Sequence, residues 1–295
     1  MRLDVLYRGP LASCNYGCAY CPFAKRKDTR AQLTSDRAAW TRFVAWLAAR
    51  PATDQLGVLV TPWGEALIRR WYRDGMVELS HLPQVTRIAA QTNLSASLDW
   101  IRAANPERLA LWCTYHPEWT THAEFVAQCA RLADAGVQFS VGVVGQRAYL
   151  EPARALRSAL PSATYLWINA VMALGYSAEE RAQWTAIDPL FELNTQRYAS
   201  LGKPCGAGSR AITVDGDGTM RRCHFIAAPI GNLYADDWAA ALVPRACTNT
   251  DCHCHIGYVH LDELALDEVF AGGFLERVAT PEARARGVRL PVLAR

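Results

Sequence analysis

Three cysteines stand close together near the start of the chain, in the segment SCNYGCAYCPF at residues 13–23. Cys14, Cys18 and Cys21 have the spacing C-x3-C-x2-C. A cubane iron–sulfur cluster needs four ligands, so a loop that supplies three thiolates leaves one iron open to another ligand. A tetrahedral zinc site would need a fourth cysteine or histidine nearby, and the next histidine is His81. The spacing therefore favours an iron–sulfur cluster with one open position.

A second group of cysteines lies in the last third of the chain. Its five members are Cys205, Cys223, Cys247, Cys252 and Cys254. A cubane takes four thiolates, so this group leaves one thiol over. Zinc is the alternative, since His253 and His255 are interleaved with the last two cysteines. Cys113 and Cys129 stand apart from both groups, and we expect them to be buried packing residues.

Length and composition narrow the class of protein. The chain has 295 residues, of which 51% are hydrophobic, enough for one large domain or a domain with an appendage. A net charge of +3 is too small to predict nucleic acid as a partner. Neither a signal peptide nor a long apolar run is present, so we expect a cytoplasmic protein with no membrane partner. Ten cysteines in that compartment predict metal binding or chemistry and not a disulfide framework.

The elements that must position these cysteines alternate between strand and helix patterns. The predicted strands are residues 3–7, 56–60, 85–92, 108–114, 137–144 and 164–171, and the clearest helices are 34–49, 120–135 and 151–160. Such alternation implies right-handed crossovers and a parallel sheet. Six strands with helices outside predict an α/β fold, a partial (β/α)6 TIM-like barrel. The first cysteine group follows the first strand, at the end where such barrels build active sites.

The pattern changes near residue 190. Residues 209–225 predict a β-hairpin with its turn at 215–218. The segment IGNLY at 230–234 and the cysteine- and histidine-rich segment ACTNTDCHCHIGY at 246–258 follow it. We therefore predict two domains, a barrel over 1–190 and a smaller hairpin and helix domain over 191–295.

The chain resembles the radical S-adenosylmethionine enzymes over nearly its whole length. Cys14, Cys18 and Cys21 match the cluster motif of that family, including the aromatic residue Tyr20 before the third cysteine. The resemblance implies a [4Fe-4S] cluster whose open iron binds the amino and carboxylate groups of S-adenosylmethionine. Reductive cleavage then yields a 5′-deoxyadenosyl radical that removes a hydrogen atom from carbon. It also implies an external one-electron donor such as flavodoxin or ferredoxin.

The same resemblance assigns contacts to the cofactor. The segment TPWGEAL at 61–67 is similar to the Gly-Gly-Glu segment of the family, with Trp63 in place of the first glycine and with Gly64 and Glu65 kept. The segment SVGVVGQ at 140–146 is similar to the Gly-x-Ile-x-Gly strand beside adenine. The other implied contacts are Thr92, Asn93, Thr114, His116, Gly142, Gly145 and Asn169.

The second cysteine group resembles the twitch or SPASM extension of some members of the family. The resemblance rests on the segment CGAG from Cys205, on G-x4-C from Gly218 to Cys223, and on IGNLY. It implies one auxiliary [4Fe-4S] cluster, because a two-cluster SPASM domain needs more cysteines. We expect Cys205, Cys223, Cys252 and Cys254 as ligands and Cys247 as the remaining thiol, with Cys252 or Cys254 as alternates.

A thiol left over beside a radical site suggests the reaction. An S–H bond is weaker than most C–H bonds, so Cys247 could return a hydrogen atom to a substrate radical from the opposite face. That outcome inverts a stereocentre, which is the reaction of an epimerase. Three alternatives stay open: dehydrogenation with no donor thiol, modification of a peptide, and a non-catalytic iron–sulfur or zinc protein.

The layout of short barrel, single auxiliary cluster and one leftover cysteine resembles the aminoglycoside epimerases of the neomycin C type. The resemblance implies an isomerase that acts on an amino sugar in antibiotic biosynthesis. A polycationic substrate of this kind needs carboxylates at the pocket mouth. The candidates are Glu65, Glu118, Glu192 and Asp251, while Trp63, Trp112 and Trp167 are candidates for the walls of a sugar site.

Overall fold

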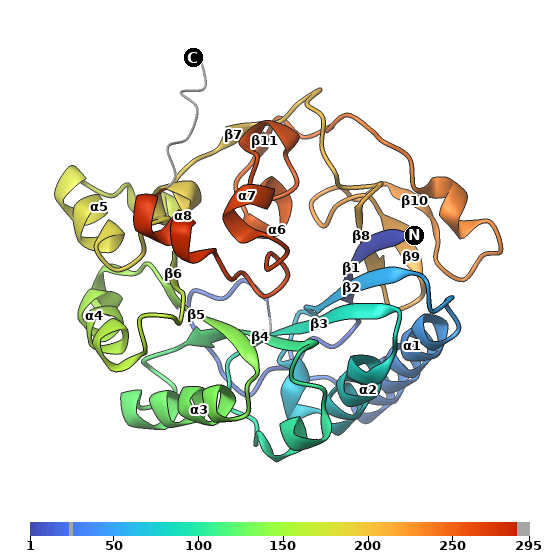
Figure 1. The fold of residues 1–295 in the computed structure, drawn as a ribbon, viewed down its shortest axis with the longest axis horizontal. Coiled ribbons are helices and arrows are strands. Elements are labelled where there is room, and N and C mark those ends of the chain that lie inside the picture. The colour runs from blue at the N-terminus through green and yellow to red at the C-terminus, as the bar shows by residue number, and fades with distance from the viewer. Residues whose placement is uncertain (24–25, 288–295) are drawn as a thin grey trace.

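A computed structural model describes residues 1–23 and 26–287 of the chain. Its centre is a nine-stranded sheet in the order β10-β9-β8-β1-β2-β3-β4-β5-β6 (Figure 1). The six parallel strands are β1 (Arg2–Arg8), β2 (Gln55–Val60), β3 (Val85–Thr92), β4 (Leu109–Tyr115), β5 (Gln138–Val144) and β6 (Leu166–Asn169). They are buried along most of their length, as parallel strands covered on both faces must be. The predicted α/β fold with a partial TIM-like barrel is confirmed.

Helices cover the outer face of this curved sheet (Figure 1). They are α1 (Arg30–Ala48), α2 (Arg70–His81), α3 (His122–Asp134), α4 (Leu150–Ala159) and α5 (Ala178–Thr185). Helix α1 begins at a capping box in which the Thr29 side chain accepts from the Gln32 backbone and the Gln32 side chain accepts from Thr29. The helix buries Trp40 and Phe43 against the sheet, on the face predicted from their spacing.

The predicted hairpin is present, but it extends the barrel sheet. Strand β8 (Ala211–Asp215) pairs parallel to β1, and β9 (Thr219–Arg221) and β10 (Pro229–Asn232) follow antiparallel. Gly218 has a φ of +90° in the turn, which a glycine adopts without strain. Because the hairpin shares the sheet of the first part, the division of the chain at residue 190 stays a prediction.

The concave face of the sheet is filled by the C-terminal segment, which the sequence did not predict. This segment carries α6 (His255–Tyr258), α7 (Asp267–Phe270) and α8 (Pro281–Arg286), and a small sheet joins β7 (Tyr198–Ala199) to β11 (Asp251–Cys252). Tyr258 and Phe270 pack in one apolar cluster with Trp112 and Trp167 of the barrel. Figure 1 shows α6 and α7 lying across the open side of the sheet. The segment therefore closes the barrel from within.

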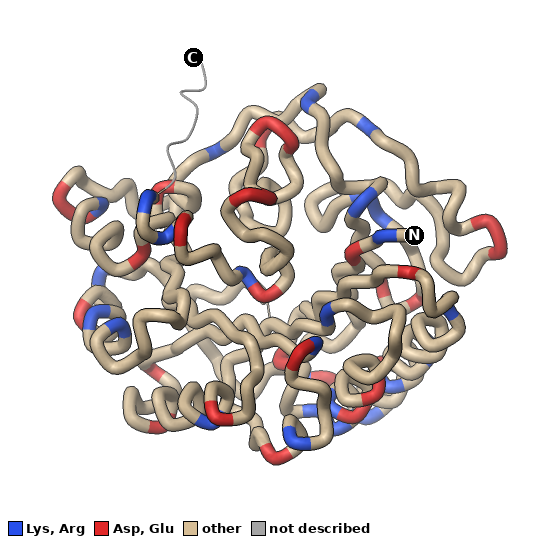
Figure 2. Tube along the Cα trace, viewed as in Figure 1, with Lys and Arg blue, Asp and Glu red and all other residues tan. Residues whose placement is uncertain are grey.

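Charged residues of both signs are interspersed over the outer helices (Figure 2). This distribution fits the net charge of +3. No helix in the described part of the chain has the length and apolar character needed to cross a membrane.

Candidate active site

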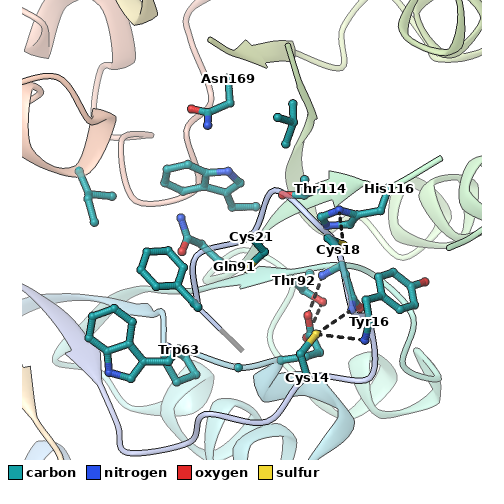
Figure 3. Close-up of a pocket in the computed structure, with 18 of the residues that line it drawn as sticks. Cys14, Tyr16, Cys18, Cys21, Trp63, Gln91, Thr92, Thr114, His116 and Asn169 are labelled. Carbon is teal, nitrogen blue, oxygen red and sulfur yellow. Dashed lines mark hydrogen bonds between the residues drawn. The ribbon is translucent and has the colours of Figure 1, made fainter. Parts of the chain in front are cut away.

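A cavity of about 350 Å³ lies at the carboxyl ends of the parallel strands, in the size range of small-molecule sites (Figure 3). Cys14, Cys18 and Cys21 all lie on its wall. Cys254 is the one member of the second cysteine group that lines it. The cavity wall therefore contains the three cysteines of the first group and one cysteine of the second.

The loop that carries the first three cysteines is fixed by Asp28. Its Oδ2 atom accepts from the backbone of Ala12 at 3.0 Å and from the backbone and hydroxyl of Ser13 at 2.8 and 2.6 Å. Burial acts to raise the pKa of Asp28, but these hydrogen bonds outweigh it and lower the pKa. The Sγ atom of Cys14 accepts from the Tyr16 backbone at 3.3 Å. Burial raises the pKa of the Cys14 thiol, and this N–H donor opposes the rise.

Cys18 lies beside His116 (Figure 3). The Nδ1 atom of His116 is 3.5 Å from Cys18 Sγ and 2.6 Å from the hydroxyl of Tyr20. Burial lowers the pKa of His116 to about 4, so the ring is neutral at neutral pH. Tyr20 does not line the cavity. Its hydroxyl contacts His116 instead, and a direct contact of Tyr20 with the cofactor stays a prediction.

Glu65 joins the ends of β2 and β3. One carboxylate oxygen accepts from the Thr92 hydroxyl at 2.9 Å and from the Leu67 backbone at 3.1 Å, and the other accepts from the Asn93 backbone at 2.7 Å. Burial raises the pKa of Glu65, and these hydrogen bonds oppose the rise. The structure thus brings Glu65, Thr92 and Asn93 together on the cavity wall, as the sequence predicted.

Gly64 is needed where the loop after β2 crosses the cysteine loop. Its backbone donates to the carbonyl of Leu11 at 3.0 Å, and a Cβ atom at this position would run into the backbone of Ser13. The neighbouring Trp63 is 39% exposed and lies at the rim, 5.0 Å from the ring of Phe23. Replacement of the expected glycine by Trp63 therefore adds an aromatic wall to the cavity.

The remaining predicted contacts divide into two kinds. Thr114 and Asn169 line the cavity, whereas Gly142 and Gly145 do not. A Cβ atom at Gly142 would overlap the ring of Trp167, which does line the cavity. Gly145 donates to the carbonyl of Asn169 at 2.8 Å. The two glycines thus shape the site through their neighbours.

Three cysteines of the second group, Cys205, Cys223 and Cys247, are held near one another by hydrogen bonds of neighbouring residues. The backbone N–H of Cys247 donates to the carbonyl of Lys203 at 3.0 Å, which places Cys247 near Cys205. Arg222 donates from Nη2 to the carbonyl of Arg245 at 2.8 Å, which holds the neighbouring Cys223 near the same segment.

The thiols of this group also shift one another's pKa. Burial raises the pKa of Cys252 to about 12, with further contributions from Cys223, Cys254, Cys205 and Cys247. Burial likewise raises the pKa of Cys223 to about 11, with contributions from Cys205 and Cys247. Cys247 does not line the cavity.

The donor set fits an iron–sulfur cluster. All ten cysteines are thiols, and none forms a disulfide. Within residues 1–23 and 26–287, no three cysteine, histidine or acidic side chains lie close enough together to hold a single metal ion. A four-iron cluster spaces its cysteine ligands more widely than one ion does, and three thiols on one wall leave room for it. The two sets of cluster ligands remain predictions.

Three of the four predicted mouth carboxylates lie off the cavity. Glu118 accepts from the Tyr149 hydroxyl at 2.6 Å. Glu192 pairs with Arg181 at 2.7 Å, and Asp251 pairs with Arg197 at 2.9 Å. Only Glu65 lines the cavity, and its oxygens are already hydrogen-bonded. Of the four candidates, the structure therefore places only Glu65 on the cavity wall.

Several residues of the site were not predicted from the sequence. Arg8, Gln91, His224 and Arg277 line the cavity. The position of Arg8, at the end of the first strand, was a signal that could have identified it. His224 follows a predicted ligand, but nothing in the sequence placed Arg277 in the barrel.

The fold is similar to that of the protein anSMEcpe, whose structure is known. Native anSMEcpe with bound AdoMet has a TM-score of 0.55 and 13% identity over 81% of this chain and 80% of that one. The same protein with AdoMet and the Kp18Cys peptide has a TM-score of 0.53 and 13% identity, with the same coverage. BtrN in complex with AdoMet and 2-DOIA has a TM-score of 0.39 and 15% identity over 81% and 85%. No family model and no curated protein matches the sequence.

Proposed function

We propose that this chain is a radical S-adenosylmethionine enzyme. The observation that carries the proposal is the position of Cys14, Cys18 and Cys21 on one cavity wall at the carboxyl ends of the parallel strands. The fold of AdoMet-bound anSMEcpe supports it. When bound, a [4Fe-4S] cluster and S-adenosylmethionine supply a 5′-deoxyadenosyl radical, which removes a hydrogen atom from a substrate carbon.

The residues of the chain then have distinct tasks. The three thiolates bind the cluster and leave one position open for the cofactor. Asn93, held by Glu65, presents polar groups beside Cys14, since its Nδ2 atom lies 3.7 Å from that sulfur. His116 lines the cavity, and because its ring is neutral it adds no positive charge to the site.

We further propose that Cys205, Cys223, Cys247 and Cys252 hold an auxiliary [4Fe-4S] cluster. Backbone contacts and mutual effects on pKa support Cys205, Cys223 and Cys247. Cys252 interacts with these three and also with Cys254, so the choice of Cys252 as the fourth ligand rests on the position of Cys254. Cys254 is then the remaining thiol, in place of Cys247, because it alone of the five reaches the cavity.

The reaction we propose is epimerisation. After hydrogen abstraction the S–H bond of Cys254 breaks and a new C–H bond forms on the substrate. The thiyl radical left on Cys254 is reduced by one electron from an external one-electron donor and takes up one proton. Return of hydrogen from a different side than its removal inverts the carbon.

The substrate is a small molecule that fits among aromatic walls, since Trp63, Trp112 and Trp167 all line the cavity. The amino-sugar prediction needed several carboxylates, and the cavity has only Glu65. We therefore retain the reaction type in this proposal and leave the aminoglycoside out of it.

Iron analysis of anaerobically reconstituted protein tests the assignment of thiols. We expect about eight irons per chain in the wild type and in Cys254→Ala, and about four in Cys252→Ala and in Cys18→Ala. Cys129→Ala is the matched control, since Cys129 lies buried on α3 away from the cavity. Loss of iron from Cys254→Ala with retention in Cys247→Ala would reverse the roles of these two thiols. Substrate turnover that persists in Cys254→Ala would indicate dehydrogenation.

A further inference from the structure

Two buried arginines line the cavity. Arg8 is 7% exposed and Arg277 is 2% exposed. The Nε atom of each is buried without a hydrogen-bond partner. Among the described residues, no carboxylate forms a salt bridge with either guanidinium. Because burial of an unpaired charge is costly, these two cations require an explanation.

The neighbours of Arg8 leave its charge uncompensated. It donates from Nη2 to Nε2 of His224 at 2.8 Å, and its guanidinium carbon lies 4.4 Å from the ring centroid of Trp63. Cys254 and Asp215 both act on Arg8 electrostatically, but Cys254 is a thiol and Asp215 is itself paired with Arg221 at 2.7 Å. Burial lowers the pKa of Arg8 to about 10, so the group is still a cation at neutral pH.

Arg277 is held on aromatic faces. Its guanidinium carbon lies 4.2 Å from the ring centroid of Trp167 and 5.4 Å from that of Trp112, and Nη2 donates to the side chain of Asn194. Cys254 and Asp188 both interact with it electrostatically. The Asp188 oxygens accept from the Tyr165 hydroxyl and from the backbone of Ile168 and Leu190. These contacts orient the guanidinium without neutralising it.

Both arginines lie beside the second cysteine group. His224, the partner of Arg8, follows Cys223 in the chain. His255 follows Cys254 and packs 5.3 Å from the ring of Trp112, which also carries Arg277. Among the described residues, Glu65 is the one carboxylate that lines the cavity, and it lies beside the group around Cys14. The positive charge therefore lies where a substrate between the two cysteine groups would bind.

We propose that the substrate of this site is an anion, a small molecule with a carboxylate or phosphate group that Arg8 and Arg277 bind. A guanidinium offers paired donors that match either oxyanion. The apolar tryptophan walls lower the local polarity and strengthen the attraction. A polycation at the same place would meet two like charges. The proposal rests on the proposed function only in taking this cavity as the active site.

Small ligands that differ in charge test whether the cavity prefers an anion. Inorganic phosphate, glucose 6-phosphate, glucose and glucosamine are titrated anaerobically into reconstituted protein saturated with S-adenosylmethionine, at constant ionic strength. Tryptophan fluorescence and the thermal midpoint report binding. We expect phosphate and glucose 6-phosphate to bind, with affinities at least tenfold above those of glucose and glucosamine.

The variants locate the anion. Arg8→Gln should lower the affinity for glucose 6-phosphate at least tenfold. Arg8→Lys should retain part of that affinity because it keeps the positive charge. Arg277→Lys should behave as Arg8→Lys does, which avoids an unfolded Arg277→Ala. Arg154→Gln is the control, since Arg154 pairs with Glu151 on the outer helix α4.

Two results would overturn the proposal. One is a different ligand preference: phosphate and glucose 6-phosphate do not bind, or glucosamine binds more tightly than they do. The other is competition between phosphate and S-adenosylmethionine together with an equal loss of cofactor affinity in Arg8→Gln, which would assign the arginines to the cofactor carboxylate. Formation of 5′-deoxyadenosine without added substrate, measured on the same preparation, shows whether the proposed function stands when the anion does not bind.

Discussion

Arg8 Nη2 and His224 Nε2 lie 2.8 Å apart although 216 residues separate them in the chain. Arg8 ends the first strand of the barrel, and His224 follows Cys223 beyond the hairpin. Because a guanidinium only donates, the imidazole must accept, and its ring is neutral. This one hydrogen bond joins the barrel to the second cysteine group at the wall of the cavity.

The Arg8–His224 bond should be measurable as a coupling. In a double-mutant cycle of Arg8→Gln and His224→Ala, we expect an interaction energy of about 1–3 kcal/mol, as for other hydrogen bonds to charged groups. Denaturant unfolding of the four proteins under anaerobic conditions measures it. Strictly additive effects would show that the two side chains do not stabilise one another.

Gly142→Ala should disturb the cavity indirectly. The added methyl group would overlap the ring of Trp167, which supports Arg277. We expect a loss of about 1–3 kcal/mol in the free energy of unfolding, as for other overpacked cores, and altered tryptophan fluorescence. Gly231→Ala on the outer strand β10 is the control, because its nearest neighbour is the side chain of Ala241 at 3.3 Å. Equal stability of both variants would contradict the packing described here.

Glu65→Gln should loosen the wall beside Cys14. The amide would place a donor opposite a backbone or hydroxyl donor, since the carboxylate now accepts from Thr92, Leu67 and Asn93. We expect about 1–3 kcal/mol lower stability and weaker binding of S-adenosylmethionine, measured by thermal unfolding and equilibrium dialysis. Glu124→Gln, in the capping box of α3, keeps the cap and should leave cofactor binding unchanged. A Glu65→Gln protein with wild-type cofactor affinity would remove Glu65 from the site.

Asp188 should give the protein a pH-dependent stability. Burial raises its pKa to about 6, above the value near 3.9 of an unfolded chain. The folded state therefore holds the proton more tightly than the unfolded state does. Ionisation of Asp188 lowers the free energy of unfolding by up to about 3 kcal/mol as pH rises from about 4 to 6. Asp188→Asn removes the titration. Its unfolding free energy, measured against that of the wild type across this pH range, should diverge by that amount, and parallel curves would contradict the shift.

The barrel was predictable from the sequence because its strands are continuous apolar runs. The third strand has the predicted bounds, residues 85–92, and the others differ by one to a few residues. The resemblance to the radical S-adenosylmethionine enzymes assigned Glu65, Thr92 and Asn93 to one site, and the structure brings these three residues together. Local patterns thus specify most of the barrel and one wall of its cavity.

The inner covering of the barrel was not predictable in this way. Helices α6 and α7 have four residues each, too few for a helical repeat to show. Arg277 reaches Trp167 only because this segment packs inside the sheet. The exchange of roles that we propose between Cys247 and Cys254 has the same origin, because chain spacing does not reveal which thiol faces a cavity.

The central claim is that Cys14, Cys18 and Cys21 hold a cluster that cleaves S-adenosylmethionine. Anaerobically reconstituted protein is mixed with S-adenosylmethionine and dithionite, and 5′-deoxyadenosine is measured by mass spectrometry. We predict formation by the wild type and by Cys129→Ala, and its loss in Cys14→Ala, Cys18→Ala and Cys21→Ala. Reconstituted wild-type protein that contains iron and sulfide but forms no 5′-deoxyadenosine would contradict the claim.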